Sequence, residues 1–501
     1  MAPASPSLLS LFGVAALATA LLYLLPRRQS KSTLAFPPGP KSPTMPTLDI
    51  WLKYQEWGRE YGDLVYIRER NMLITNKAQV AIDLLEKRAR IYSDREGSWT
   101  VHLCGAERSL PTQPYSNKWR SNRKLYNSVF RQSTRDRFHP GQYKKTQEFL
   151  HSLLTTPEKF MQHTMALSQS LMYASLYGLD ISYEDPLARR AAETVDIFGQ
   201  IFLNGFPTLE RFPWLRFMPS FFPGCGFQQS AHEFRENLSD LDTIPFDRAM
   251  NNLKTGNGSS VIAELAQKSE GNPGEIEMIK GMGTISFISA SDTTMSVISS
   301  FLLAITLHPD VQAKGRAEID RVVGRDRLPT FEDRQSLPYI ESIYRETMRM
   351  NPSVPLGVSH VSTEDDVYRG YYIPKGCVVV PNIWAMGRDP DVYSEPDRFI
   401  PERFMDSPAG PFANINDIHA FGFGRRVCVG RYMADNTVWL TIASVLATLD
   451  LRKDKDKAGN EIDIPGEFTR TFFRHPTPYQ SSITPRDQQA RELILATAEL
   501  K

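Results

Sequence analysis

The chain has 501 residues, and its 58 lysine and arginine residues almost balance its 57 aspartate and glutamate residues, leaving a net charge of +1. No global positive field favours a nucleic-acid partner, so none is expected. The four cysteines, Cys104, Cys225, Cys377 and Cys428, are widely spaced. They show no paired metal-ligand spacing, so neither a disulfide framework nor a zinc site is predicted, and a reducing compartment is expected.

The N-terminal segment predicts a membrane anchor. Residues 8–25 carry no charge, and as a helix they would be about 27 Å long, close to one hydrocarbon core. Arg27, Arg28 and Lys31 follow, and basic residues on this flank keep that side in the cytosol. We expect a luminal N-terminus over 1–7 and a single-pass signal anchor, with the rest of the chain on the cytosolic side. A cleaved signal peptide is the alternative.

Residues 26–50 predict a basic and proline-rich hinge after the anchor. Pro37-Pro38-Gly39-Pro40 cannot continue a helix and predicts a stiff elbow. No low-complexity or Gly/Ser-rich linker interrupts the chain beyond it. Residues 51–501 are therefore expected to form one domain.

The pattern beyond the hinge is mostly helical. Residues 64–75 predict an early hairpin, with apolar runs flanking a polar turn. The longest predicted helix runs from Glu275 to Leu307 and would be about 50 Å long, enough to cross a whole domain. Its middle, residues 283–303, contains one acid and no base, so we expect it to be buried nearly all round.

Three shorter helices and a second hairpin complete the expected elements. The helices are predicted over 309–323, 337–350 and 432–448; Gly324 ends the first and Pro352 ends the second. The hairpin is predicted between residues 371–373 and 377–380, joined through Pro-Lys-Gly. Together these elements predict a mainly α fold with small β-sheets.

Residues 421–430, Phe-Gly-Phe-Gly-Arg-Arg-Val-Cys-Val-Gly, surround Cys428 with glycines and arginines. A thiol binds a metal only as the thiolate. The glycines permit a tight loop whose amides point at the sulfur, and the following helix places its positive end there. Arg425 and Arg426 add positive charge, and Arg426 can pair with an acidic cofactor group. An inert buried cysteine is the alternative for a lone cysteine.

This segment resembles the haem-binding loop of the cytochrome P450 family, Phe-x-x-Gly-x-Arg-x-Cys-x-Gly, and all five fixed positions match. Val429 stands where many relatives carry proline. The resemblance implies haem b as the cofactor and Cys428 as the axial ligand of its iron. It also implies that Phe421 and Arg426 contact the cofactor.

Two further segments resemble the family's contacts to the haem propionates. Trp119 and Arg123 match Trp-x-x-x-Arg, whose indole N–H and guanidinium reach a propionate. His360 stands where relatives place a second propionate partner. Without the cysteine loop, the first motif would read as a basic surface helix with one core tryptophan.

Asp292 and Thr293 lie in the middle of the long apolar helix, where an acid is costly unless it has a partner or a function. Residues 289–294, Ser-Ala-Ser-Asp-Thr-Thr, resemble the family's (Ala/Gly)-Gly-x-(Asp/Glu)-Thr-Thr. The resemblance implies that Asp292 and Thr293 deliver protons during dioxygen activation, beside a locally opened helix. The alternative is a satisfied helix acid beside threonines that bond to the preceding turn.

Glu346 and Arg349 lie at i and i+3 and share one helix face. Residues 396–404 match the family's Pro-x-x-Phe-x-Pro-x-Arg-Phe segment, whose arginine is Arg403. The resemblance implies that Glu346, Arg349 and Arg403 form a structural network behind the cysteine loop.

These motifs follow the family's order along nearly the whole chain, and several phrases, such as Phe-Arg-His-Pro at 473–476, are similar to microsomal fungal members that tailor specialised metabolites. The resemblance implies a cytochrome P450 fold with the long helix over the haem. It implies a haem-thiolate monooxygenase in the endoplasmic reticulum membrane, acting on a lipophilic molecule in terpenoid or polyketide biosynthesis. The segments expected to face the substrate are 96–114, 197–206, 354–358 and 471–473.

The resemblance also implies that NADPH-cytochrome P450 reductase supplies electrons, with cytochrome b5 as an additional partner. No dinucleotide or flavin motif occurs in the chain itself. Lys124, Arg425 and Arg431 are expected to dock the reductase's acidic surface. The alternatives are xenobiotic detoxification, a reductase-independent rearrangement, and a non-catalytic haem sensor or scaffold.

Overall fold

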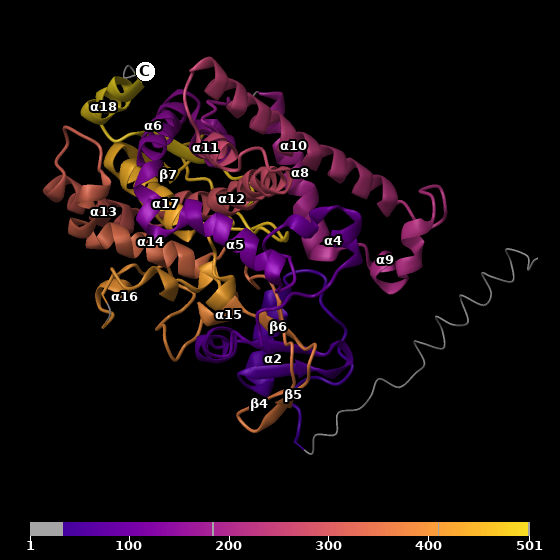
Figure 1. The fold of residues 1–501 in the computed structure, drawn as a ribbon. Helices are drawn as coiled ribbons and strands as arrows, with labels where there is room; N and C mark the ends of the chain where they lie inside the picture. Colours follow the sequence, from indigo (N-terminus) through magenta and orange to yellow (C-terminus); the bar gives the residue numbers. More distant parts are fainter. Residues whose placement is uncertain (1–33, 183–184, 409, 499–501) are drawn as a thin grey trace, which may run out of the picture.

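The computed structural model describes residues 34–182, 185–408 and 410–498 (Figure 1). The predicted luminal segment 1–7 and the predicted anchor 8–25 lie outside the described residues, as does the first part of the hinge.

Helix α12 (Pro273–Leu307) runs through the middle of the molecule (Figure 1). It begins two residues earlier than predicted because Asn272 caps it, its side-chain oxygen accepting from the amides of Gly274 and Glu275. The helix is long and apolar enough to cross a membrane, but 83% of its most apolar window is buried inside the structure. It is therefore a core helix, buried nearly all round as predicted.

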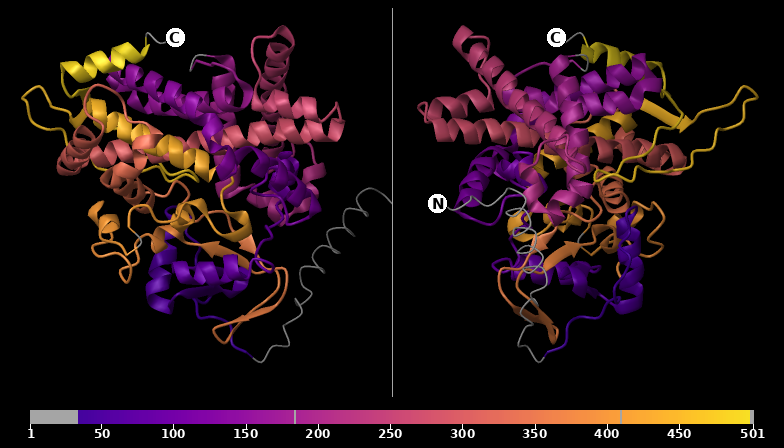
Figure 2. Two further views of the ribbon diagram at one scale, coloured as in Figure 1. Left: turned by 60° about the vertical axis from the view of Figure 1, so that its left-hand side comes forward. Right: turned by 90° about the vertical axis from the view of Figure 1, so that its right-hand side faces the viewer.

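The other helices surround α12 on several sides (Figures 1 and 2). Their bounds are α2 (Ile50–Tyr61), α3 (Ala78–Ala81), α4 (Trp99–Leu103), α5 (Asn117–Phe130), α6 (His139–Thr155), α7 (Phe160–Met172), α8 (Pro186–Asn204), α9 (Pro207–Arg211), α10 (Phe227–Thr255), α11 (Val261–Lys268), α13 (Pro309–Val322), α14 (Pro338–Met350), α15 (Ile383–Met386), α16 (Glu402–Met405), α17 (Arg431–Thr448) and α18 (Gln488–Ala498). The predictions for α13, α14 and α17 are confirmed to within one residue at each end.

Short 3-10 and π segments connect many of these helices. They are η1 (Arg68–Arg70), η2 (Ile82–Lys87), η3 (Ala106–Arg108), η4 (Gln132–Phe138), η5 (Pro157–Lys159), η6 (Tyr173–Tyr177), η7 (Pro213–Phe217), η8 (Phe331–Ser336), η9 (Ile415–Asp417), η10 (His419–Phe421) and η11 (Gly424–Arg426).

The strands form small sheets, so the fold is mainly α with small β-sheets, as predicted. One four-stranded sheet has the order β1-β2-β6-β3, and two-stranded sheets pair β4 with β5 and β7 with β8. The strands are β1 (Leu64–Ile67), β2 (Met72–Thr75), β3 (His360–Val361), β4 (Asp366–Tyr368), β5 (Tyr371–Ile373), β6 (Val378–Pro381), β7 (Leu449–Lys453) and β8 (Ser481–Pro485). The predicted hairpin over 64–75 is confirmed, because β1 and β2 pair antiparallel.

The predicted hairpin between 371–373 and 377–380 is wrong. Strand β5 pairs with the preceding strand β4, whereas β6 pairs parallel with β2 and antiparallel with β3. The tight turn lies instead at Arg369 and Gly370, which have φ of 50° and 82°. Two successive left-handed residues make the turn that best matches the twist of a hairpin, so the chain folds back before β5 rather than after it.

The described part of the proline-rich hinge is fastened to the sheet. The Tyr66 amide of β1 donates to the Pro38 carbonyl over 2.8 Å, and the Phe36 ring stacks on Tyr66 with ring centroids 5.1 Å apart. A Cβ on Gly39 would lie 2.1 Å from the Tyr66 carbonyl oxygen, so this approach requires glycine. Residues 36–39 are therefore docked on β1.

Two large hydrophobic clusters share α12 between them. Its first half, with Ile285 and Ile288, packs in a cluster with side chains of α5, α8 and α10. Its second half, with Val297 and Phe301, packs with side chains of α6, α14 and α17. The turn from Ser289 to Thr293 lies between the clusters, and an internal cavity opens at this turn.

Candidate active site

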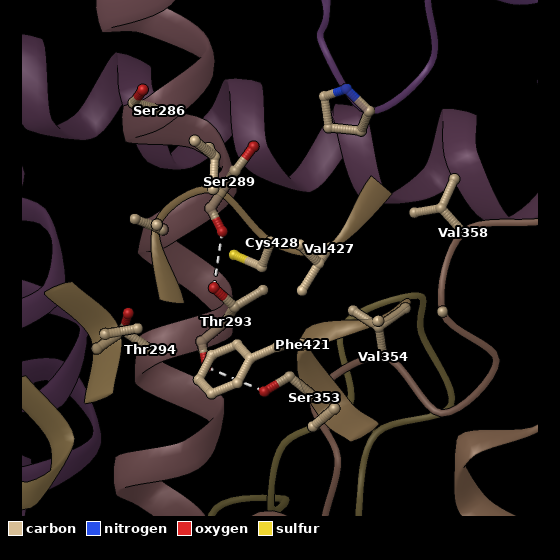
Figure 3. A pocket seen from close by; sticks show the side chains of 18 of the residues that line it. Ser286, Ser289, Thr293, Thr294, Ser353, Val354, Val358, Phe421, Val427 and Cys428 are labelled. Atoms are coloured by element: carbon tan, nitrogen blue, oxygen red, sulfur yellow. Dashed lines mark hydrogen bonds between the residues drawn. The ribbon is translucent and has the colours of Figure 1, made fainter. Parts of the chain in front are cut away.

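An internal cavity of about 320 Å³ lies between α12, α5 and the cysteine loop. Cys428 of the loop and Thr293 of α12 both line it, and Figure 3 shows them facing the same space. The rest of its lining is mostly apolar and includes Trp119, Phe198 and Phe473. A volume of this size fits a small-molecule site.

The loop around Cys428 is held by backbone contacts. The Cys428 amide donates to the Phe421 carbonyl over 2.8 Å. Gly424 has φ of 56°, and a Cβ there would lie 2.1 Å from the Leu85 carbonyl oxygen, so glycine is required on both grounds. Cys428 is exposed toward the internal cavity, whose wall it lines. A ligand in the cavity can therefore reach the thiol.

The electrostatics of the thiol differ in part from the expectation. Burial raises the pKa of Cys428, and the Gly430 amide, Arg123 and Arg431 act in the opposite direction. The amides act as predicted, but burial outweighs them. A bound metal ion deprotonates a coordinating thiol outright, so the thiolate depends on the metal as well as on the loop.

Arg425 and Arg426, expected to supply positive charge to the sulfur, bind elsewhere. The Arg425 guanidinium donates to the Tyr115 hydroxyl over 2.6 Å. Arg426 donates to the carbonyls of Ser93 and Gln113, each over 2.8 Å, and its guanidinium lies 4.3 Å from the centre of the Trp119 ring. Arg426 lines the cavity beside Trp119, so it is placed for a cofactor rather than for the thiol.

The other predicted propionate partners also line this cavity. Arg123 donates to the Val427 carbonyl over 2.8 Å, which ties α5 to the cysteine loop. His360 is buried and donates through Nδ1 to the Tyr92 carbonyl over 2.7 Å. Burial, with Arg95 nearby, holds the pKa of His360 well below its usual range, so the ring is neutral and Nε2 is an acceptor. Nε2 can therefore donate to a carboxylate only after the ring takes up a second proton. The negative charge of a nearby carboxylate would favour that protonation.

The sequence reasoning missed Arg95. Its guanidinium donates to the carbonyls of Pro111 and Ser359, each over 2.7 Å, and its side chain lines the cavity. Burial and the neighbouring Arg426 hold the pKa of Arg95 well below its usual range. No motif marks this arginine, which directly precedes a segment expected to face the substrate.

The lining fits a haem. Three arginines, Arg95, Arg123 and Arg426, meet on the cysteine-loop side, and the described lining residues include no aspartate or glutamate to neutralise them. The buried indole nitrogen of Trp119 has no hydrogen-bond partner among the described residues. A flat apolar ring with two acidic arms would occupy the cysteine-loop side of the cavity, satisfy this donor and balance the charge.

Of the two residues predicted to relay protons, Thr293 lines the cavity and Asp292 does not. The Thr293 hydroxyl lines the cavity and donates to the Ser289 carbonyl over 2.7 Å (Figure 3). Asp292 is buried, with 8% of its surface exposed, but it is not among the lining residues. Helix α12 is continuous through both residues, so the predicted local opening is not present in this structure.

Hydroxyl groups from two other segments bind the same turn of α12. Ser168 of α7 donates to the carbonyls of Ala290 and Ser291 over 3.0 and 2.6 Å. Ser353 donates to the Thr293 carbonyl over 3.0 Å (Figure 3). These bonds hold the turn at its place on the cavity wall.

Glu346, Arg349 and Arg403 form a buried network. Glu346 is fully buried and accepts from Arg349 over 2.6 and 2.8 Å, and from Arg403 over 3.1 Å. It also accepts from the Ile400 amide over 2.7 Å. Arg349 donates in turn to the carbonyls of Gly387 and of two residues between β6 and α16. The three predicted residues therefore meet, with their charges and donors largely satisfied.

Each of the four segments expected to face the substrate contributes to the cavity. The described lining side chains from them include Leu110, Phe198, Val354, Val358 and Phe473. Residues of α12 and α7, such as Ile285, Ser286 and Leu171, also line it and were not predicted.

The chain is similar to known proteins along most of its length. The family model Cytochrome P450 matches residues 44–483. The chain is 36% identical to Cytochrome P450 monooxygenase 136 of Postia placenta, over 96% of this chain and 94% of that one. It is 34% identical to Cytochrome P450 monooxygenase COX1 of Coprinopsis cinerea (94% and 95% covered) and 32% identical to Tryptamine 4-monooxygenase of Psilocybe cyanescens (94% and 97% covered).

A solved structure of a zebrafish cytochrome P450 with abiraterone has the same fold, with a TM-score of 0.68 at 22% identity, over 87% of this chain and 100% of that one. With a family model spanning most of its length and relatives above 30% identity along nearly all of it, this chain belongs to the cytochrome P450 family and is a haem-thiolate monooxygenase.

Proposed function

We propose that this monooxygenase oxidises a lipophilic small molecule in fungal secondary metabolism, with terpenoids and polyketides as the candidate substrate classes. The observation that carries the proposal is the apolar cavity with Cys428 and Thr293 on its walls. The fungal origin of the curated relatives supports the biological setting.

The haem, when bound, activates dioxygen so that one oxygen atom enters the substrate and the other leaves as water. The residues of this chain hold it in place. Cys428 would supply the thiolate ligand, which would donate electron density to the iron. Trp119, Arg123, Arg426 and His360 are proposed to bind its acidic arms, and the Phe421 side chain, which lines the cavity, is proposed to contact the ring.

Thr293 and Asp292 are proposed to move the protons that the second oxygen atom needs. The Thr293 hydroxyl is at the cavity wall and can pass a proton on when it releases the Ser289 carbonyl. Asp292 is one residue earlier and is buried away from the lining, so it would resupply the threonine rather than contact the substrate.

The Glu346, Arg349 and Arg403 network is proposed to be structural. It joins α14 to the segment between β6 and α16, which leads into the cysteine loop. This role concerns the geometry of the domain, proposed to be a single catalytic domain over 51–501.

Electrons are proposed to come from NADPH through a separate cytochrome P450 reductase, with cytochrome b5 as a second donor. Lys124 and Arg425 are exposed near the cysteine loop and would meet an acidic partner surface. Arg431 is half-buried and donates to the Cys428 carbonyl over 2.9 Å. It is therefore better placed to support the cysteine loop than to contact the reductase.

The protein is proposed to lie on the endoplasmic reticulum membrane through the anchor at 8–25, with its catalytic domain in the cytosol. Exposed aromatic side chains support contact with a lipid surface: Phe217 and Phe221, between α9 and α10, are 75% and 86% exposed. Asn257, an exposed residue in a glycosylation sequon, provides the test. Sugar on Asn257 in a natural host would contradict the cytosolic assignment.

The activity is tested with the purified full chain, NADPH, reductase and candidate lipophilic compounds. We expect oxygen uptake that requires both the reductase and a compound that shifts the haem spin state. Product formed without NADPH would support a reductase-independent rearrangement instead. Compounds that shift the spin state without any oxygen uptake would support a haem sensor.

A further inference from the structure

We propose that the substrate is an elongated, uncharged lipophilic molecule that carries a hydroxyl or carbonyl oxygen, and that Ser286 of α12 binds this oxygen. The inference rests on the proposed function, since it assigns a ligand group to the same cavity. It depends on the charge of the lining, on a hydroxyl without a partner, and on the position of that hydroxyl.

The charge of the lining disfavours a cationic substrate. The described residues that line the cavity include no aspartate or glutamate. An ammonium group that left water for this site would find no opposite charge there, and an unpaired buried charge is strongly destabilising.

An anionic substrate is disfavoured for a different reason. Arg95, Arg123 and Arg426 are the guanidinium side chains among the described lining residues, and each already donates to backbone carbonyls near the cysteine loop. That is the side proposed to hold the acidic arms of the haem. A substrate carboxylate would compete with the haem for the same donors.

Ser286 carries the polar contact. Only 8% of its surface is exposed, it lines the cavity (Figure 3), and its hydroxyl has no hydrogen-bond partner among the described residues. Two other serines of α12 find a partner within the helix: Ser291 donates to the Phe287 carbonyl over 2.8 Å and Ser299 to the Met295 carbonyl over 2.7 Å. A ligand oxygen would supply the partner that Ser286 lacks.

The position of Ser286 limits the length of the ligand. It precedes Thr293 by two helical turns on the same face, which corresponds to about 10 Å along the helix axis. Ile285 and Phe198 line the apolar wall of the same cavity. The bound oxygen and the carbon to be oxidised are therefore about 10 Å apart, a separation that a farnesyl chain spans.

The test compares four ligands with one carbon chain in the haem-loaded full-length enzyme. These are farnesol, farnesene, farnesoic acid and farnesyltrimethylammonium, whose nitrogen has no lone pair for the iron. Dissociation constants are measured by equilibrium dialysis and by the haem spin-state shift. We expect farnesol to bind most tightly, and the acid and the ammonium compound to bind least.

Two variants assign the preference to the serine. Ser286→Ala should raise the dissociation constant of farnesol by about 3- to 10-fold and change that of farnesene by less than about twofold. Ser300→Ala is the matched control, because Ser300 is a buried serine of α12 whose hydroxyl has no partner in the described part of the chain and which does not line the cavity. It should change neither constant.

The proposal is overturned if the alanine variant affects both ligands equally or neither. It is also overturned if a charged ligand binds more tightly than farnesol, or if none of the four binds. The carbon monoxide spectrum and reductase-dependent oxygen uptake are recorded alongside. Their loss would count against the proposed function, whereas their retention without ligand preference would count against this inference alone.

Discussion

The two walls of the cavity are built from different chemistry. The cysteine-loop wall contains guanidinium groups, among them the buried Arg95 and the half-buried Arg426, which are fixed by backbone carbonyls. The α12 wall contains hydroxyl groups, Ser286 and Thr293, within an apolar surface. Fixed charge suits a permanent cofactor with acidic arms, whereas neutral hydroxyls suit an exchanging substrate and proton transfer. The comparison predicts that changes on the first wall affect the haem, and changes on the second affect turnover and coupling.

The largest effect is expected for Cys428→Ser, which removes the ligand from the first wall. The reduced carbon monoxide complex should lose its long-wavelength Soret band completely, because that band requires a thiolate on the iron. Cys104→Ala, at a buried cysteine outside the cavity lining, is the control and should keep the band. A normal band in the serine variant would remove Cys428 as the ligand.

Glu346→Ala should be the next most severe change. It leaves two buried guanidinium groups without their shared carboxylate, which typically costs about 3–5 kcal/mol of stability. Thermal unfolding and haem content measure the loss. Glu56→Ala breaks an exposed pair with Lys53 at the same i, i+3 spacing and should change stability by less than about 1 kcal/mol. Equal effects of the two variants would disprove a special role for the network.

Asp292→Asn acts on the second wall and should leave the haem spectrum intact. Turnover should fall by at least about tenfold, about 1.4 kcal/mol of barrier, because the proton supply to Thr293 is lost. Steady-state product formation measures it. Unchanged turnover would mean that Asp292 serves only the packing of α12.

Thr293→Ala should separate electron use from product formation. The variant should continue to consume NADPH while it releases peroxide in place of product, because the hydroxyl at the cavity wall is missing. Thr293→Ser retains a hydroxyl and should restore most of the coupling. If alanine leaves the ratio of product to NADPH unchanged, the threonine is not in the relay.

The smallest effect is expected for Trp119→Phe on the first wall. The ring is kept but the indole N–H is lost, which corresponds to about 1 kcal/mol for one hydrogen bond and a few-fold faster haem loss. Transfer of haem to an excess of an acceptor apoprotein gives the rate. Trp439→Phe is the control, since Trp439 is also buried with an unpartnered indole nitrogen but does not line the cavity. Similar rates for both variants would exclude a bond from Trp119 to the haem.

Local signals made part of this structure predictable. The limits of α12, α13 and α14 are set by proline, glycine and capping residues within a few positions of each end, so the sequence predicted them closely. The cysteine loop has the same character, because Gly424 is required by its own backbone angle and by one close contact.

Features that depend on distant segments were not predictable in the same way. The partner of β6 is β2, which lies about three hundred residues earlier in the chain, and no local pattern specifies this pairing. Arg95 became a cavity residue only because the chain brings it beside Arg426, and Ser286 became distinctive only because a hydroxyl without a partner among the described residues lines the cavity. Such residues are recognised from packing rather than from spacing.

The docking of Gly39 on Tyr66 would limit the tilt of the catalytic domain relative to the proposed membrane anchor. The Ala35 carbonyl accepts from the Tyr372 amide of β5 over 2.9 Å, and residues 36–39 are docked on β1, so the described part of the hinge from Ala35 onward moves with the body. Any side chain at position 39 would collide with the Tyr66 carbonyl and detach residues 36–39 from β1. The proposed anchor would then be joined to the body by a longer free segment.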